Sequence, residues 1–428
     1  MDPKKTELGL KKLAGQILER AGGLPLRIFI RMKKGLLVRF TNNGVYQNGF
    51  QDQLIYQLRC RTKSGAVCVH SDDDSMEGIE DALSTIRKAI GKAVLPSVSK
   101  RTGVSKSNEF FPIAIEEADE LASRSIGEGL DLIRRNRASA NGYFSAYERF
   151  FYFLDTIGRE LFHPATAVRF GTTVTRGAGK GYHSFYHPDR RKLKVSEVVR
   201  RALDWAERGS SDEVELEPRE YECILSPRAF LELIEPLRRH FDSDLCQKGK
   251  SVFSGLLGKK LFAPAFTLSD DVTAPGQFGV PFDAEGVPRR KIALVERGVL
   301  KGLLGEGAAT QGMRDDPVYP ENLTAKGGSG SLEELFKRIK KGIFINKIRY
   351  HTLVREAGME VTGLATAGCL YVENGQVVGR VNHLRYHDSL LSILGSITDA
   401  SQERFLLKDG EMGAALLPYF LISKLRVV

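Results

Sequence analysis

Hydrophobic residues in the first part of the chain follow first a helical and then a strand spacing. Apolar positions three and four residues apart predict an amphipathic helix over residues 6–21. Short apolar stretches between turn-forming residues then predict an antiparallel meander; they lie at 26–32, 36–40, 54–60 and 66–70. Helical spacing returns from Ile79 to Ile90, behind three aspartates that suit the amino end of a helix. We therefore expect residues 1–96 to form one α+β unit.

The middle of the chain repeats this mixture after a segment without periodicity. Residues 96–108 are rich in Ser and Lys and predict an exposed connector. A helix, two aromatic-rich strands and an amphipathic helix are expected after it, at 113–135, 143–154, 167–175 and 195–206. We therefore expect a central α+β region over residues 109–209 that packs with the first unit. The polar and acidic residues 210–220 are the best boundary after it.

Strand patterns dominate the rest of the chain. Residues 221–225 are a strand candidate, and residues 227–240 predict a short helix that is interrupted at Pro236, which has no amide hydrogen. Two hairpins are indicated by their corners, Arg297-Gly298 and Asn374-Gly375. We expect residues 219–428 to form a mostly antiparallel, β-rich domain with a few helices. The fold class of the whole chain is then α+β.

The composition is typical of a large folded protein, and it also indicates the cellular compartment. The 428 residues are 42% hydrophobic and 27% charged, which is enough apolar material for a large core and too much for a disordered chain. Five cysteines without a C-x-x-C pair are too few and too scattered for a disulfide framework. Neither a signal-peptide pattern nor a transmembrane run of about 20 apolar residues is present. We expect a cytoplasmic protein that does not contact a membrane.

The basic surplus permits nucleic-acid binding without indicating it. The formal net charge is +10, spread over a long chain. The densest basic cluster, Lys337 to Lys341, follows Glu333 and Glu334 and is typical of a solvated helix face. Since no recognised DNA- or RNA-binding motif accompanies it, nucleic acid is not an expected partner.

Two glycine-rich segments and one serine motif do not support catalytic or phosphate-binding sites. Residues 177–181 lack the first glycine and the Ser or Thr of a phosphate-binding loop, so we expect a hairpin tip. Residues 305–310 miss the last glycine of a dinucleotide-binding fingerprint. Ser329 lies between two glycines in a polar loop, without the strand-to-helix turn of a hydrolase nucleophile.

Histidine pairs are the remaining candidates for metal chemistry. His183 with His187 and His383 with His387 have the spacing H-x3-H, but they lie in strand-like stretches. On a strand such residues are about 13 Å apart, at ~3.3 Å per residue, too far apart to share one ion. Structural or surface roles are therefore expected. No histidine is followed by glutamate, so H-E-x-x-H and H-E-x-x-x-H are both absent.

Several segments resemble the TldD/PmbA family, once described as modulators of DNA gyrase and now regarded as zinc proteases. They are PFDAEGVP at 281–288, LVERGVLK at 294–301, TGL at 362–364 and VENG at 372–375, with a looser match in TNNGV at 41–45. The resemblance covers nearly the whole chain. In TldD-type members it implies zinc held by H-E-x-x-x-H on a helix and by a cysteine near the chain end, with the glutamate activating water.

This chain departs from that zinc motif. Lining up the strand 223–227 with the strand before the family's motif helix places Glu235 over the first ligand, Pro236 over the general base and His240 over the second ligand. Proline cannot transfer a proton, and no cysteine follows Cys369. The resemblance therefore implies the PmbA/TldE type, with no catalytic, cofactor-binding or metal-binding residues in this chain and only Glu235, Pro236 and His240 as remnants.

The resemblance implies a non-catalytic, TldE-like subunit of a cytosolic metallopeptidase assembly. Its partner would be a TldD-like catalytic subunit carrying zinc, in a heterodimer acting on small, unfolded or modified peptides; a homodimer is the fallback. Two alternatives remain open. One is a divergent peptidase with a rearranged metal site, drawn from Glu235, His240, His351 and Cys246. The other is a regulatory binding protein linked to DNA gyrase.

Overall fold

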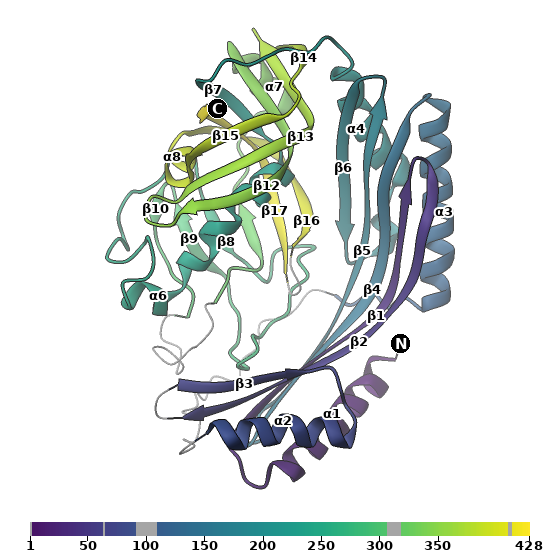
Figure 1. Cartoon of the computed structure of the whole chain (residues 1–428), viewed down its shortest axis with the longest axis vertical. Coiled ribbons are helices and arrows are strands. Elements are labelled where there is room, and N and C mark those ends of the chain that lie inside the picture. The colour runs from purple at the N-terminus through teal and green to yellow at the C-terminus, as the bar shows by residue number, and fades with distance from the viewer. Residues whose placement is uncertain (1, 63–64, 91–108, 306–317, 410–412) are drawn as a thin grey trace.

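The computed structural model describes residues 2–62, 65–90, 109–305, 318–409 and 413–428. Within these ranges the chain forms two β-sheets, one in each half, and the helices pack on them (Figure 1). The fold is α+β, as the sequence predicts. The expected connector at 96–108 and residues 306–310 of the second glycine-rich segment lie outside the described residues.

The amino-terminal half is built on a six-stranded antiparallel sheet with the strand order β3-β2-β1-β4-β5-β6. Its strands are β1 (Leu26–Thr41), β2 (Gly44–Thr62), β3 (Gly65–Ser71), β4 (Ser139–Asp155), β5 (Glu160–Arg176) and β6 (Gly179–His187). Most are long and curved (Figure 1). The turn between β5 and β6 falls at Gly177 and Ala178, so the first glycine-rich segment is a hairpin tip.

The two short strands expected at 26–32 and 36–40 are one continuous strand, β1. Gly35, which interrupts the hydrophobic pattern, lies opposite Tyr147 of β4. A Cβ atom at Gly35 would come within 2.3 Å of the Ala146 carbonyl oxygen and of the Tyr147 Cβ. The glycine therefore permits close strand contact and does not mark a turn.

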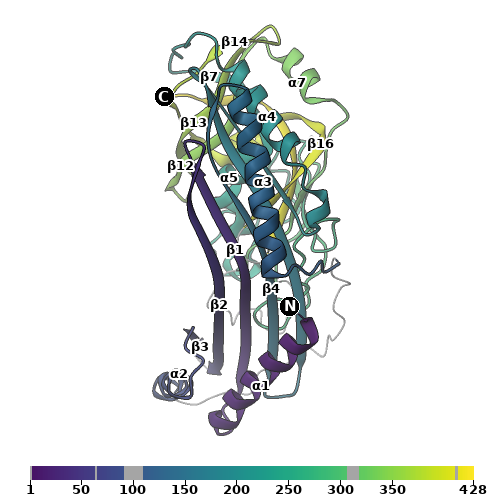
Figure 2. The same cartoon turned by 90° about the vertical axis from the view of Figure 1, so that its right-hand side faces the viewer.

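Alternation along β1 separates the two faces of this sheet. Even-numbered residues such as Ile28 and Leu36 pack against the helices, whereas Phe29 packs against the carboxyl-terminal half. The covering helices are α1 (Pro3–Ala21), α2 (Met76–Ala89), α3 (Ile115–Arg135) and α4 (Val195–Arg208). Figure 2 shows α1, α3 and α4 along this helical face. The sheet is thus a middle layer between four helices and the rest of the protein.

The carboxyl-terminal half contains a mixed, mostly antiparallel sheet, which has eleven strands within the described residues. Its strands are β7 (Glu220–Leu225), β8 (Leu268–Asp270), β9 (Ile292–Glu296), β10 (Val299–Leu300), β11 (Leu323–Ala325), β12 (Lys341–Arg355), β13 (Glu360–Glu373), β14 (Gln376–Arg380), β15 (Leu384–Ser389), β16 (Ile397–Asp409) and β17 (Gly413–Arg426). Two neighbouring pairs, β7 with β12 and β11 with β17, are parallel. The helices are α5 (Pro227–Ile234), α6 (Ser243–Gln247), α7 (Leu332–Arg338) and α8 (Leu390–Gly395).

Both predicted hairpins are present at the predicted corners. Arg297 and Gly298 join β9 to β10 with φ of 48° and 82°, and Asn374 and Gly375 join β13 to β14 with φ of 50° and 79°. Positive φ at both corner residues is the geometry of a two-residue type I′ turn. The basic cluster differs from expectation, because α7 ends at Arg338 and Lys341 already belongs to β12.

Two further expectations from composition can be compared with the structure. All five cysteines are free thiols, so the scattered cysteines form no disulfide framework. No described helix combines the length and the apolar character that a membrane crossing requires.

Candidate functional site

The segment that the resemblance aligns with a zinc motif begins where α5 ends. Ser226 caps α5, because its Oγ accepts the Ala229 N–H at 3.1 Å. The α-helix stops at Ile234, and residues 235–241 continue as a 3₁₀ helix. Pro236 has no N–H to offer the preceding turn, so the α-helical pattern ends there, as predicted.

Glu235 and Pro236 lie on the open side of this segment. The Glu235 side chain is 59% exposed, and its Oε2 accepts a hydrogen bond from Arg238 Nη1 at 2.8 Å. The Arg238 guanidinium is buried and also donates from Nε to the Pro320 carbonyl at 3.0 Å. Glu235 therefore serves as an ionic partner of a structural arginine.

His240 lies on the opposite, buried side. Its side chain is inaccessible to solvent, its ring contacts Phe253, and its Nδ1 accepts the Val252 N–H at 3.3 Å. Burial lowers the pKa of His240, although the Glu356 carboxylate, 3.6 Å from Nε2, opposes that shift. The His240 carbonyl accepts the Ser251 hydroxyl at 2.7 Å. His240 thus anchors the following loop and does not share a site with Glu235.

The residues of the divergent-peptidase alternative do not come together around one metal position either. His351 pairs through Nδ1 with the Tyr386 hydroxyl at 2.7 Å, and burial lowers its pKa to about 4. The Cys246 thiol lies 3.6 Å from the His240 carbonyl oxygen. Across the described ranges, no three His, Cys, Asp or Glu side chains are grouped closely enough to hold a metal ion. The residues present therefore do not fit a zinc site of the two-histidine-and-cysteine kind.

The histidine pairs also occupy separate positions. His183 and His187 lie on β6, where the His183 ring contacts Phe405 and the His187 Nδ1 accepts the Asp189 N–H at 2.9 Å. His383 precedes β15 and His387 lies on it. The Ser329 loop continues into Ser331, whose hydroxyl caps α7. His183 and His187 thus have structural contacts, and the His387 Nε2 lies 3.9 Å from the Glu360 carboxylate.

An open groove of about 520 Å³ lies beside α5 and β12. Its polar lining comprises Arg228, Glu232 and Glu235 from α5 and the residue after it, and Lys347, Arg349, Tyr350 and His351 from β12. Sequence reasoning identified only Glu235, Pro236 and His351 of this lining. The spacing of Arg228 and Glu232, four residues apart on a helix, could have indicated their ion pair, but nothing local indicates that β12 lies beside them.

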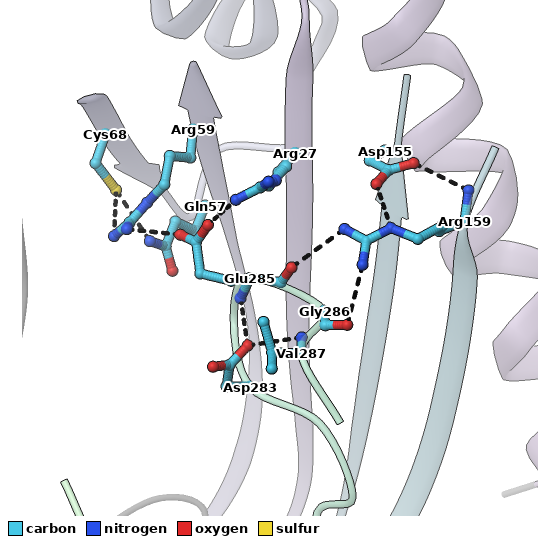
Figure 3. Close-up of polar contacts among 10 residues, drawn as sticks. All are labelled: Arg27, Gln57, Arg59, Cys68, Asp155, Arg159, Asp283, Glu285, Gly286 and Val287. Atoms are coloured by element: carbon cyan, nitrogen blue, oxygen red, sulfur yellow. Dashed lines mark hydrogen bonds and ion pairs between the residues drawn. The ribbon is translucent and has the colours of Figure 1, made fainter. Parts of the chain in front are cut away.

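A second polar cluster joins the two halves of the chain (Figure 3). We call Arg27 of β1, Arg59 of β2 and Glu285 the buried ion cluster. Arg27 Nη1 donates to Glu285 Oε2, and Arg59 Nη1 lies 2.6 Å from Glu285 Oε1. The three side chains are only 4%, 8% and 6% exposed. The cluster therefore excludes solvent almost completely.

The loop that carries Glu285 is shaped by its own neighbours and held by Arg159, which immediately precedes β5. Asp283 Oδ1 accepts the N–H groups of Glu285 and Val287, each at 2.9 Å. Arg159 donates to the carbonyl groups of Glu285 and Gly286, each at 3.3 Å, and its Nε donates to buried Asp155 at 2.7 Å (Figure 3). The segment 281–288, which belongs to the family resemblance, is thus one of the places where the second half contacts the first sheet.

The carboxyl-terminal half matches a known protein family. Residues 218–428 match the model of the PmbA/TldA metallopeptidase C-terminal domain. The chain is similar to a metalloprotease of Methanocaldococcus jannaschii, with 28% identity over 209 residues, 45% of this chain and 46% of that protein. It is also similar to a TldD homologue of Buchnera aphidicola, with 26% identity over 196 residues, 42% of this chain and 40% of that protein. The chain thus matches less than half the length of these two relatives.

The fold of the whole chain is shared with solved structures. TldE from Thermococcus kodakarensis superposes with a TM-score of 0.81 at 18% identity, covering 97% of this chain and 100% of that chain. A candidate modulator of a DNA gyrase from Thermotoga maritima superposes with a TM-score of 0.80 at 18% identity, covering 98% and 100%. At these identities the likeness is one of fold, and it extends over both halves.

Proposed function

We propose that the chain, whose residues 218–428 match the PmbA/TldA metallopeptidase C-terminal domain, is a non-catalytic, TldE-like subunit of a peptidase assembly. The observation that carries this proposal is the separation of the motif remnants. Glu235 faces solvent and binds Arg238, whereas His240 is buried in the loop contacts on the other side of the segment. The two side chains do not converge on one ion.

The chemistry of zinc hydrolysis supports the same conclusion. A catalytic zinc needs three protein ligands, an open position for water and a carboxylate that can take the proton of that water. The position aligned with the carboxylate is Pro236, which cannot transfer a proton. The only carboxylate of the remnant, Glu235, is engaged by the guanidinium of Arg238. The segment therefore contributes to structure and to the wall of the groove.

The proposed assembly pairs this chain with a TldD-type subunit that carries the zinc and cuts small, unfolded or modified peptides. This part rests on the match to the family's C-terminal domain and on the fold shared with TldE. The present chain would then contribute a peptide-binding surface and no reacting group. A homodimer is the alternative assembly.

The test compares the purified chain alone with the chain purified together with a TldD-type partner. Zinc content is measured by inductively coupled plasma mass spectrometry, and cleavage is measured on an unfolded peptide mixture with and without chelator. We expect zinc and chelator-sensitive cleavage only in the co-purified assembly. Co-elution with the partner in size-exclusion chromatography should accompany that activity.

A pair of variants makes the test decisive. Replacing the two motif histidines of the partner should abolish zinc binding and cleavage, whereas His240→Ala in this chain should leave the zinc content per assembly unchanged. Chelator-sensitive cleavage by the isolated chain, lost in His240→Ala but not in His387→Ala, would refute the proposal and restore the divergent-peptidase alternative.

A further inference from the structure

The groove between α5 and β12 contains more positive than negative charge. Arg228, Lys347 and Arg349 line it together with Glu232 and Glu235. Glu235 is already engaged by Arg238, which does not line the groove. The net positive charge of the groove is therefore larger than the numbers of lining cations and carboxylates indicate.

Both oxygens of the Glu232 carboxylate already accept hydrogen bonds within the protein. Its Oε1 accepts a hydrogen bond from Arg228 Nε at 2.9 Å, and its Oε2 accepts the Ile348 N–H at 3.0 Å. The latter bond ties α5 to β12. Lys347 and Arg349 form no ion pair with any described carboxylate.

Lys347 shows the consequence of this imbalance. Its ammonium lies 4.2 Å from the centre of the Tyr182 ring, a cation–π contact and not an ion pair. Burial lowers the pKa of Lys347, and Arg228 adds to that shift, although Glu232 opposes it. The charged form of this lysine is thus held in a place that disfavours it when the groove contains no anion.

A fourth cation, Arg169, lies against a different tyrosine, Tyr143. The Arg169 guanidinium lies 5.1 Å from the centre of the Tyr143 ring and 3.4 Å from the Tyr143 hydroxyl, and among the described residues it has no carboxylate partner. Tyr182 and Arg228 in turn lie close enough to interact electrostatically. Cations removed from water are costly unless a counter-charge compensates them, so this region is suited to an anion supplied from outside.

The backbone of β12 departs from regular pairing at the groove. Its pairing with β13 breaks between Arg349 and Thr352, and Tyr350 between them has a φ of 53°. A tyrosine in this region of φ is strained, and such strain gathers at ligand sites. Tyr350 as a whole is 75% exposed and lines the groove.

We propose that this groove binds a carboxylate group of an extended peptide, with Lys347, Arg349 and Arg228 as its cationic contacts and Tyr350 beside the peptide backbone. The choice of a peptide rests on the proposed function, whereas the choice of a carboxylate rests on the charges of the groove. A nucleic-acid backbone fits less well, because Glu232 and Glu235 lie in the same groove and the cations form a single cluster, not a track.

The carboxylate could be the peptide terminus or an acidic side chain, and the experiment separates the two. Three fluorescein-labelled hexapeptides of Ala and Ser are titrated into the intact chain by fluorescence anisotropy, at low salt. The first has a free carboxyl terminus, the second has a terminal amide, and the third has a terminal amide and one internal Asp. We expect at least tenfold weaker binding of the second peptide than of the first or the third. Whichever of those two binds more tightly identifies the source.

Variants connect the binding to the groove. The double variant Lys347→Met/Arg349→Met should weaken binding of the carboxylate peptides at least tenfold, and Lys347→Arg should retain most of it. Lys250→Met, an exposed lysine beyond α6, is the matched control and should have no effect. Circular dichroism and the unfolding midpoint of each variant show that it is folded.

Two outcomes would overturn the proposal. One is equal affinity for all three peptides, or carboxylate-dependent binding that survives the double variant. The other is tighter binding of a DNA duplex that the same double variant abolishes, which would assign the groove to a polyanion. Since these titrations use the isolated chain and measure no cleavage, they can fail while the subunit role stands, and they can succeed even if the chain cleaves peptides by itself.

Discussion

The buried ion cluster and the α5–β12 groove use the same residue types for opposite purposes. In the cluster, two arginines surround one glutamate and all three side chains are nearly inaccessible to solvent. In the groove, cations again outnumber free carboxylates, but the site is open and two of its cations have no described anionic partner. The buried, paired charges of the cluster join the two halves of the chain. The exposed cations of the groove that have no described ion-pair partner are available to a ligand.

Among the variants that test this contrast, we expect the largest change in stability from a substitution in the buried ion cluster. Glu285→Gln removes the carboxylate that both Arg27 and Arg59 contact while their side chains stay buried, so we expect the free energy of unfolding to fall by about 3–5 kcal/mol. Urea unfolding followed by circular dichroism measures the change. Glu296→Gln, an exposed glutamate 3.9 Å from Lys301, is the control and should change stability by less than about 0.5 kcal/mol.

A triple variant shows whether charge or packing causes the loss of stability in Glu285→Gln. Arg27→Met/Arg59→Met/Glu285→Leu removes every charge of the cluster and keeps its apolar volume, so it should recover most of the stability lost in Glu285→Gln. If Glu285→Gln alone costs less than about 1 kcal/mol, the cluster does not hold the halves together by charge.

Acidification should weaken both regions through buried histidines. Burial lowers the pKa of His163, which stacks on Phe151 at the junction, to about 4, and that of His351 in the groove to about 4. The unfolded chain takes up these protons from about pH 6.5 downward and the folded chain does not, so stability falls as the pH falls. For His163 the loss between pH 7 and pH 5 should be about 2 kcal/mol, and for the less buried His351 it should be smaller.

The pH dependence of urea unfolding in variants checks this assignment. His163→Gln should make the slope between pH 7 and pH 5 less steep, and the buried His183 and His351, whose pKa values are also lowered, should account for the slope that remains. His387→Gln, which retains both His163 and His351, should keep the slope of the parent chain. An unchanged slope in His163→Gln would place the acid sensitivity elsewhere.

A smaller effect is expected from the arginine that supports the Glu285 loop. Arg159 donates to Asp155 and to two loop carbonyls through different nitrogens of one planar group, which a lysine cannot reproduce. Arg159→Lys should therefore destabilise the protein by about 1–2 kcal/mol in the same unfolding measurement. Arg355→Lys, at an exposed pair with Glu360, should have almost no effect. Equal losses in the two variants would contradict the role given to the loop contacts.

The smallest effect on stability is expected in the groove. Lys347→Met removes a half-buried cation that has no anionic partner among the described residues, so we expect a change within about 1 kcal/mol, neutral or stabilising, at pH 7. Because burial lowers the pKa of Lys347, the cost of its charge should shrink as the pH rises toward 10.5, and any gain in the variant should vanish there. A loss of several kcal/mol would show that Lys347 is structural.

Local features of the fold could be predicted from the sequence, because they depend on neighbouring residues. The corners at Arg297-Gly298 and Asn374-Gly375, and the end of α5 before Pro236, follow from the backbone preferences of those residues. The continuity of β1 could not be predicted in the same way. Gly35 resembles a turn residue in sequence, and its role depends on Tyr147 in a strand more than a hundred positions later.

The candidate site could be predicted from the sequence even less than the fold, because its residues are far apart along the chain. The alignment with a zinc motif drew attention to Glu235, Pro236 and His240, and the burial of His240 becomes visible only in the fold. Lys347 is an unremarkable lysine in an alternating strand until α5 is placed beside it. Likewise, the sequence places Glu285 in a family segment but assigns it no role, since its partner Arg27 is 258 positions away.

That separation along the chain has a consequence for synthesis. A growing polypeptide releases Arg27 and Arg59 from the ribosome long before the loop at 281–288 has been translated. Through this interval the first sheet lacks the Glu285 carboxylate that both guanidinium groups contact, and its aromatic face that includes Phe29 and Phe151 is uncovered. The amino-terminal half must therefore await the rest of the protein, and a prematurely terminated product would present chaperones and proteases with an unfinished surface.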